Sequence, residues 1–319
     1  MTRYLTQRFI SLIPMMIGVS ILVFAAIRLV PGDLITAQLG TEAGMLSEEQ
    51  RQSLEAFYGL DKSPIEQYFI WMSDVLTGNL GLSVRQGQPV LELILSRFPI
   101  TLELAIISVA IAVVIGIPLG IVAAIYSNSF IDLLARIIAM IGLSVPNFLL
   151  GTLIIYILSV YFRILPNSGN YVSFSENPLQ NLQQMVFPAL TLGTSFSASV
   201  MRMTRSSMLE VMNEDYIRTA RSKGLLEFLV IRRHALKNAL IPVITLIGIE
   251  FGYLLGGTFI VEQIFAIPGI GRLTVNAITQ RDYALVQGVT LFIAINFVLI
   301  NLLVDALYTA IDPRVRYDD

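Results

Sequence analysis

The stretch that decides the fold is DYIRTARSKGLLEFLVIRRHALKNALIP, residues Asp215–Pro242, a short polar island between two long apolar segments. Its positive charge is carried by Arg218, Arg221, Lys223, Arg232, Arg233 and Lys237. Loops between membrane-spanning helices that carry many Lys and Arg residues stay on the cytoplasmic side of the membrane. The stretch is therefore expected to be a cytoplasmic connection in a chain that crosses the membrane several times.

The composition agrees with a membrane-spanning chain. Of the 319 residues, 55% are hydrophobic and 14% are charged, and the mean hydropathy is +0.72. Soluble domains carry about 25% charged residues, and about 20 apolar residues suffice to cross a bilayer as a helix. We expect an all-α polytopic membrane protein with six transmembrane helices, at about residues 9–30, 100–126, 133–160, 186–209, 240–262 and 286–310.

The placement of Lys and Arg along the chain predicts its orientation. With the N-terminus in the cytoplasm, the cytoplasmic segments also hold Arg3, Arg8, Arg136, Arg202, Arg205, Arg314 and Arg316. The short outer loops then hold only Arg163, Arg272 and Arg281. Both termini are expected in the cytoplasm. The first apolar segment is read as a retained helix, because it is longer than the core of a signal peptide.

The long segment 31–99 is expected outside the membrane as a small, mostly helical extracytoplasmic cap. Ser47 followed by Glu48 and Glu49 is typical of a helix start, where a hydroxyl caps the first turn and acidic residues favour it. Residues 64–76 place apolar side chains at helical spacing. The segment is too small to be read as an independent domain.

Several kinds of chemistry are excluded by the sequence. The chain has no cysteine and a single histidine, His234, so thiolate and multi-histidine metal sites are excluded. It contains no G-x4-G-K-[ST] phosphate loop, no G-x-S-x-G nucleophile elbow and no H-E-x-x-H zinc motif. No catalytic residue, no metal, no bound cofactor and no nucleic-acid partner is expected.

The order of residues in the basic stretch says more than its charge. Asp215–Ala220 reads as a short amphipathic helix, Gly224 lies where a helix ends or turns, and a second helix begins near Glu227. A helix–glycine–helix protrusion on a membrane surface suits a groove on a partner protein. The alternative is that the charges only fix the orientation of the chain, and the pattern alone leaves both interpretations open.

Ionisable residues within predicted membrane helices are functional candidates. Glu103 and Glu250 are candidates for lining a translocation path, and Asp305 lies near the inner end of the last helix. The alternative for Glu250 is a structural hydrogen bond, and Glu103 and Asp305 can reach the membrane interface. Rows of glycine at 116 and 120, and at 248, 252 and 256, permit close helix packing. The second row fits either ordinary packing within the chain or a contact with a second membrane subunit.

The basic stretch resembles one family closely. It follows the pattern D-Y-x-R-T-A-R-x-K-G and then H-A-L-x-N-A-x-x-P, which is similar to the permease subunits of dipeptide, oligopeptide and nickel ABC importers. It departs at Arg218, Thr219 and Lys237 from the generic importer pattern E-A-A-x3-G-x9-I-x-L-P. Further resemblance lies in Gly81-Leu82-Ser83, Thr101-Leu102-Glu103-Leu104, Arg202–Met208, Pro268–Leu273, Arg281-Asp282-Tyr283 and Asp312–Tyr317.

The resemblance implies an architecture and a set of partners. It implies a type I ABC importer permease fold in which residues 1–319 form a single permease domain of a bacterial or archaeal inner membrane. Residues 1–30 form the N-terminal cytoplasmic end and the first span, 31–99 the extracytoplasmic segment, and 100–319 five further spans with a coupling loop at about 210–239. The implied partners are a second homologous permease, two cytoplasmic ATPases that bind ATP and magnesium, and an extracytoplasmic binding protein that docks on 31–99 and 263–285.

The resemblance also implies roles for particular residues. Coupling to the ATPases is assigned to Asp215, Tyr216, Arg218, Thr219, Ala220, Arg221, Lys223, Gly224, His234 and Leu236. An outer gate is assigned to Glu262, Pro268, Gly269 and Gly271. The cargo is expected to be peptides or related small solutes, with glutathione and nickel chelates left open. The alternative is a self-contained secondary transporter that uses an intramembrane carboxylate such as Glu250.

Overall fold

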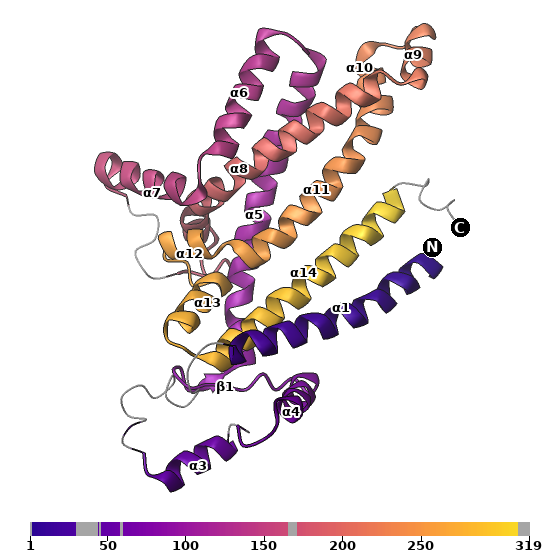
Figure 1. Ribbon diagram of the computed structural model, residues 1–319. Helices are drawn as coiled ribbons and strands as arrows, with labels where there is room; N and C mark the ends of the chain where they lie inside the picture. Colours follow the sequence, from indigo (N-terminus) through magenta and orange to yellow (C-terminus); the bar gives the residue numbers. More distant parts are fainter. Residues whose placement is uncertain (1, 30–43, 45, 58–59, 165–170, 312–319) are drawn as a thin grey trace.

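The computed structural model describes residues 2–29, 44, 46–57, 60–164 and 171–311 as a helical bundle (Figure 1). The membrane bundle contains α1 (Thr2–Arg28), α5 (Val90–Ile125), α6 (Phe130–Ser144), α7 (Asn147–Ile157), the π-helix η2 (Leu158–Phe162), α8 (Pro178–Met212), α11 (Leu236–Gly257) and α14 (Tyr283–Ile311). Its two ends carry α3 (Glu48–Phe57), α4 (Pro64–Leu76), β1 (Leu82–Ser83), β2 (Gln88–Pro89), α9 (Asp215–Ser222), α10 (Glu227–Leu229), the π-helix η3 (Val230–Ala235), α12 (Phe259–Ile264) and α13 (Ile270–Thr279).

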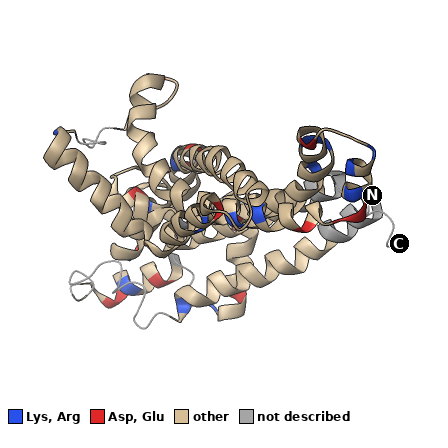
Figure 2. Cartoon of the chain, turned by 90° about the horizontal axis from the view of Figure 1, so that it is seen from above, with Lys and Arg blue, Asp and Glu red and all other residues tan. Residues whose placement is uncertain are grey.

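The bundle has two distinct ends. One end, called the loop end below, carries α9 and α10, and the start of α1 and the end of α14 lie on the same side (Figure 1). The other, called the cap end, carries α3, α4, the β1–β2 hairpin and α13 (Figure 1). Lys and Arg gather around α9 beside the marked termini, whereas the long helices are mostly free of charge (Figure 2).

Helices α5 and α8 form the centre of the bundle because small residues let them approach closely. A Cβ on Gly116 would lie 2.7 Å from the Ser197 carbonyl oxygen, and one on Gly120 would lie 2.6 Å from Thr204 Cβ. Both glycines of the first row thus pack against α8 of the same chain. Around this contact Ala112, Phe196, Val200 and Val243 are buried together.

The second glycine row packs α11 against α14 in the same way. A Cβ on Gly252 would lie 3.1 Å from the Phe297 ring, and one on Gly256 would lie 3.0 Å from Ile293. The row therefore faces a helix of the same chain. This arrangement supports the interpretation of ordinary packing over that of a surface reserved for another permease subunit.

The third predicted span differs from a continuous helix. α6 and α7 are bent by 96° relative to each other. The break falls at Val145–Pro146, where Val145 is extended with φ −80° and ψ 118°. A proline disfavours the helical conformation of the residue before it and supplies no N–H, so the chain turns there.

The expected number of six transmembrane helices is only partly matched. Among the described residues, four helices are long and apolar enough to span a membrane, and the bent α6–α7 pair makes up to five. The predicted span 186–209 falls within α8, which is 35 residues long. α8 is less apolar than the other long helices because it contains polar residues. Four of them, Thr191, Ser197, Thr204 and Ser207, are buried against neighbouring helices.

The cap end is mostly helical, as predicted, and is attached to α1. Gln50 N donates to Ser47 Oγ at 3.2 Å, which confirms the helix start at that residue. α4 contacts α1 where Arg28 Nε donates to Gln67 Oε1 at 2.8 Å and the Phe24 and Tyr68 rings meet edge to face. The β1–β2 hairpin was not predicted. The first part of the predicted extracytoplasmic segment, residues 31–43, and the motif Asp312–Tyr317 lie outside the described residues.

Candidate functional site

The helix–glycine–helix pattern of the basic stretch is confirmed by the structure. α9 begins at Asp215, and the chain turns at Gly224, which has the left-handed φ of +76°. α10 begins at Glu227, and η3 leads from it directly into α11. The stretch is a compact protrusion held by the ends of two long helices, α8 and α11 (Figure 1).

The protrusion is fixed by an apolar cluster beneath it. Ile217 is fully buried and Ala220 is 7% exposed. They pack with Met208 of α8 and with Val230, Ala235 and Ala239. Ala220, one of the predicted coupling residues, therefore holds α9 to the bundle, and its side chain is not presented at the surface.

Polar contacts join the two arms of the protrusion. Arg221 donates from Nη2 to Glu227 Oε1 at 2.6 Å and from Nε to Glu227 Oε2 at 3.1 Å. This hydrogen-bonded carboxylate raises the pKa of the Arg221 guanidinium. Asn238 Nδ2 donates to Tyr216 Oη at 2.8 Å. Arg221 and Tyr216 thus stabilise the turn itself, and His234 and Leu236 lie half-buried in the second arm.

The surface of the protrusion combines positive charge with large apolar side chains. Asp215, Arg218, Thr219 and Lys223 are exposed, as a partner-facing role requires. Leu226 is 73% exposed and Phe228 is 65% exposed at the turn between the two arms. These two residues were not predicted from the sequence. Large apolar residues directly after the turn glycine of a charged loop could have indicated a docking surface.

The two candidate acids of the translocation path lie in different settings. Glu103 on α5 accepts a hydrogen bond from Tyr171 Oη at 2.9 Å, and its Oε1 is buried without a partner. Burial raises the pKa of the Tyr171 hydroxyl, with the Glu103 carboxylate adding to the shift. Glu250 on α11 is half-buried, and no described residue forms a hydrogen bond or ion pair with its side chain. The two carboxylates thus lie on different helices, α5 and α11, and no hydrogen bond joins them among the described residues.

The predicted outer gate residues do come together, around the carboxylate of Glu262. This side chain is fully buried on α12. Its Oε1 accepts hydrogen bonds from Thr101 Oγ1 and Thr258 Oγ1, both at 2.7 Å. Its Oε2 accepts from the Arg272 backbone N at 2.9 Å. The carboxylate therefore links α5, α12 and α13.

In this gate segment, two positions leave no room for a side chain and are occupied by glycine. A Cβ on Gly269 would lie 2.5 Å from the Glu262 carboxylate, and one on Gly271 would lie 2.5 Å from Phe259 Cα. Pro268 precedes the first of them, and Ile270 N donates to Thr101 Oγ1 at 2.8 Å. The segment is a tightly packed turn between α12 and α13.

Among the described residues, no group of three or more Asp, Glu, His or Cys side chains could hold a metal ion. A mostly apolar helical bundle, with a charged protrusion at one end and a close-packed turn at the other, defines a multi-pass membrane protein. Comparison with known proteins gives the particular family.

Two family models match the chain. The binding-protein-dependent transport system inner membrane component matches residues 116–317, and the N-terminal model of the same transport systems matches residues 1–105. The chain belongs to the family of binding-protein-dependent transport system inner membrane components, the permease subunits of ABC importers. It is a multi-pass protein of the inner membrane, and permeases of this kind work with ATPase and binding-protein partners.

Relatives match over the full length. A putative peptide transport system permease protein of Brucella abortus is 43% identical over 100% of both chains. The glutathione transport system permease protein GsiC of Escherichia coli (strain CFT073) is 42% identical over 99% of this chain and 100% of the relative. A probable peptide ABC transporter permease protein of Sinorhizobium fredii is 41% identical over 98% and 99%.

Solved structures support the fold. The inward-facing MetNI methionine ABC transporter aligns with a TM-score of 0.54 at 20% identity, covering 69% of this chain and 96% of the other. At this identity the match concerns the fold alone. It confirms the expectation of a type I importer permease architecture.

Proposed function

We propose that this chain is one half of the membrane pathway of an ATP-driven importer for peptides or small peptide-like solutes. The relatives named above are permeases for peptides and for glutathione, and they align along the whole chain. A second, homologous permease would complete the pathway. The chain itself performs no chemistry, and ATP and magnesium bind to the partner ATPases.

The orientation follows from the charge distribution. The loop end carries the basic stretch, and so lies in the cytoplasm with both termini. The cap end then faces the outside, where a substrate-binding protein delivers cargo. Alternating access would open the pathway first to the cap end and then to the loop end.

The observation that carries the proposal is the construction of the α9–α10 protrusion. Ile217 and Ala220 anchor it to α8 and α11, while Arg218, Leu226 and Phe228 are exposed on it. An anchored protrusion with exposed aromatic and aliphatic side chains suits a groove on a separate ATPase. Because α8 and α11 both run into the membrane, a displacement of the protrusion by the ATPase is transmitted to the bundle.

The test uses the assembled importer reconstituted in liposomes. The partners are those that co-purify with the chain from its native membrane. L226D/F228D is expected to abolish co-purification of the ATPase and ATP-dependent uptake of radiolabelled dialanine. L179D, at an exposed leucine of α8 far along the chain from the protrusion, serves as the control. Uptake that persists without ATPase, and that E250Q removes, would instead establish a secondary transporter.

A further inference from the structure

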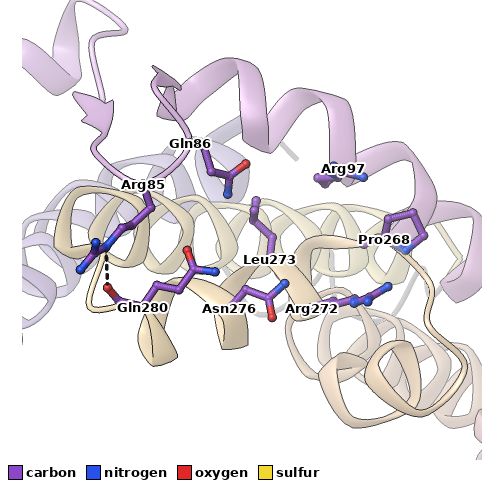
Figure 3. Close-up of a pocket in the computed structure, with 9 residues that line it drawn as sticks. Arg85, Gln86, Arg97, Pro268, Arg272, Leu273, Asn276 and Gln280 are labelled. Atoms are coloured by element: carbon purple, nitrogen blue, oxygen red, sulfur yellow. Dashed lines mark hydrogen bonds between the residues drawn. The ribbon is translucent and has the colours of Figure 1, made fainter. Parts of the chain in front are cut away.

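The cap end contains a pocket lined mainly by arginine and amide side chains. It has a volume of about 390 Å³ and lies between the β1–β2 hairpin, the first turns of α5 and helix α13 (Figure 3). Its polar lining consists of Arg85, Gln86, Arg97, Arg272, Asn276 and Gln280. Three lining residues are arginines and none is acidic, so the lining is positively charged.

The arginines come from three different elements. Arg85 lies in the turn of the hairpin, Arg97 on α5 and Arg272 on α13 (Figure 3). Arg85 Nε donates to the Gln280 carbonyl at 3.2 Å, and Arg272 Nη1 donates to the Ala266 carbonyl at 2.8 Å. These acceptors are neutral. Among the described residues no carboxylate forms an ion pair with Arg97 or Arg272, so their charge is left for an incoming group.

Buried carboxylates hold the backbone behind two of these arginines. The Arg272 backbone N donates to Glu262, which is fully buried. Asp282, which is 1% exposed, accepts from Ser83 Oγ and from the Arg85 backbone N. The backbone that carries Arg85 and Arg272 is thus held in place by buried hydrogen bonds. A preorganised frame lowers the entropic cost of binding a ligand.

The lining favours a carboxylate presented by a protein. Guanidinium and side-chain amide groups converge on the pocket, and a guanidinium binds a carboxylate with two parallel hydrogen bonds. A lipid headgroup needs an apolar surface for its acyl chains, but the aliphatic lining consists of Leu273, which is buried, and Pro268. The pocket also joins the hairpin to the segment after α12, both of them outside the long apolar helices.

We propose that this arginine pocket receives aspartate or glutamate side chains of the substrate-binding protein. The inference rests on the proposed function, and it names the chemistry by which the cap end recognises its partner. Charge complementarity at such a contact speeds encounter and fixes the register of docking. Docking would then bear directly on α13 and, through Glu262, on the gate segment.

Binding of the purified binding protein to the assembled importer in nanodiscs tests the proposal. The double variant R97Q/R272Q is expected to weaken binding by about 10-fold or more at low salt, and to flatten its dependence on salt concentration. R163Q, at an exposed arginine outside the pocket, should bind as the wild type does. Unchanged binding by R97Q/R272Q in a complex that retains its ATPases would overturn the proposal.

A crosslinking experiment identifies the partner group. In R97K and R272K complexes, a water-soluble carbodiimide should join the new amine to an aspartate or glutamate of the binding protein, located by mass spectrometry. R163K should give no such crosslink. Weaker binding only in nanodiscs that contain phosphatidylglycerol would assign the pocket to lipid and overturn the proposal. So would normal binding combined with a raised KM for dialanine uptake.

These outcomes are distinguishable from failure of the proposed function. If the wild-type chain binds neither ATPase nor binding protein, the importer assignment fails before any pocket variant is measured. If the wild-type complex assembles and responds to binding protein, only the pocket variants decide this inference.

Discussion

Thr101 and Glu262, which are 161 residues apart in sequence, form a buried hydrogen bond of 2.7 Å between Thr101 Oγ1 and Glu262 Oε1. Thr101 Oγ1 also accepts from Ile270 N at 2.8 Å. The hydroxyl thus connects a carboxylate of α12 with the first turn of α13. Two sequence motifs, Thr101–Leu104 and Pro268–Leu273, are therefore parts of one structural unit at the cap end.

The first prediction concerns this unit. E262A leaves the hydroxyls of Thr101 and Thr258 and the Arg272 backbone N without their acceptor. Each buried donor left unpaired costs roughly 1–3 kcal/mol, so the variant should unfold several degrees below the wild type. Hydrogen exchange should also become faster at residues 262–272. E92A, at an exposed glutamate of α5, is the control, and equal unfolding temperatures for both variants would contradict the prediction.

Local patterns predicted the parts of the structure that depend on neighbouring residues. The helix start at Ser47, the helix at 64–76 and the turn at Gly224 were recognised because caps, spacing and glycine act within a few residues. The predicted span 100–126 coincides with most of α5, but the helix begins ten residues earlier, at Val90, and continues through Pro99. The hairpin is too short to give a pattern of its own.

Long-range contacts could not be predicted in the same way. The residues of the outer gate were named from a family resemblance, but the sequence does not reveal that Thr101 supplies the donor to Glu262. Likewise, Ser83 and Asp282 were noted in separate motifs, and only the fold brings them into contact. The exposure of Leu226 and Phe228 depends on which side of the protrusion faces the bundle. That side is fixed by how the two halves of the protrusion pack together, which the sequence does not reveal.

The second prediction concerns close packing at Gly271. A Cβ there would lie 2.5 Å from Phe259 Cα, a backbone atom that cannot move without displacing α12. G271A should therefore destabilise the protein by about 1–3 kcal/mol, as overpacking does, and reduce uptake. G18A is the matched control, because a Cβ on Gly18 would meet nothing within 4 Å. Alanine in a helix is favoured over glycine by roughly 0.5–1 kcal/mol, so G18A should be neutral or slightly stabilising.

The third prediction concerns the turn of the protrusion. Gly224 has φ +76°, and an added Cβ would meet nothing within 4 Å, so a substitution there is opposed by backbone strain alone. G224A should cost about 1–2 kcal/mol, whereas G224N should cost less because asparagine enters the left-handed region more readily. The measurement is the affinity of the reconstituted ATPase for each variant. Equal affinities for G224A and G224N would show that the left-handed turn does not matter for docking.

The fourth prediction concerns the ion pair that holds α6 to α8. Asp132 is fully buried and accepts hydrogen bonds from Arg205 Nε at 2.6 Å and from Arg205 Nη2 at 2.8 Å. Removing one partner of a buried ion pair is costly, on the order of 3–5 kcal/mol, because the other charge is left without compensation. D132N should therefore lower the unfolding temperature strongly.

A second variant at this site separates burial from charge alone. Arg136 Nε also lies 3.4 Å from Asp132 Oδ1, but the Arg136 side chain is 48% exposed. Exposed ion pairs contribute about 0–1 kcal/mol to the free energy of unfolding. R136M should then change stability far less than R205M. In a double-mutant cycle, D132N/R205M should be less destabilised than the sum of the single variants, since neither partner is left charged and alone. Additive effects would mean that the two side chains stabilise α6 and α8 independently.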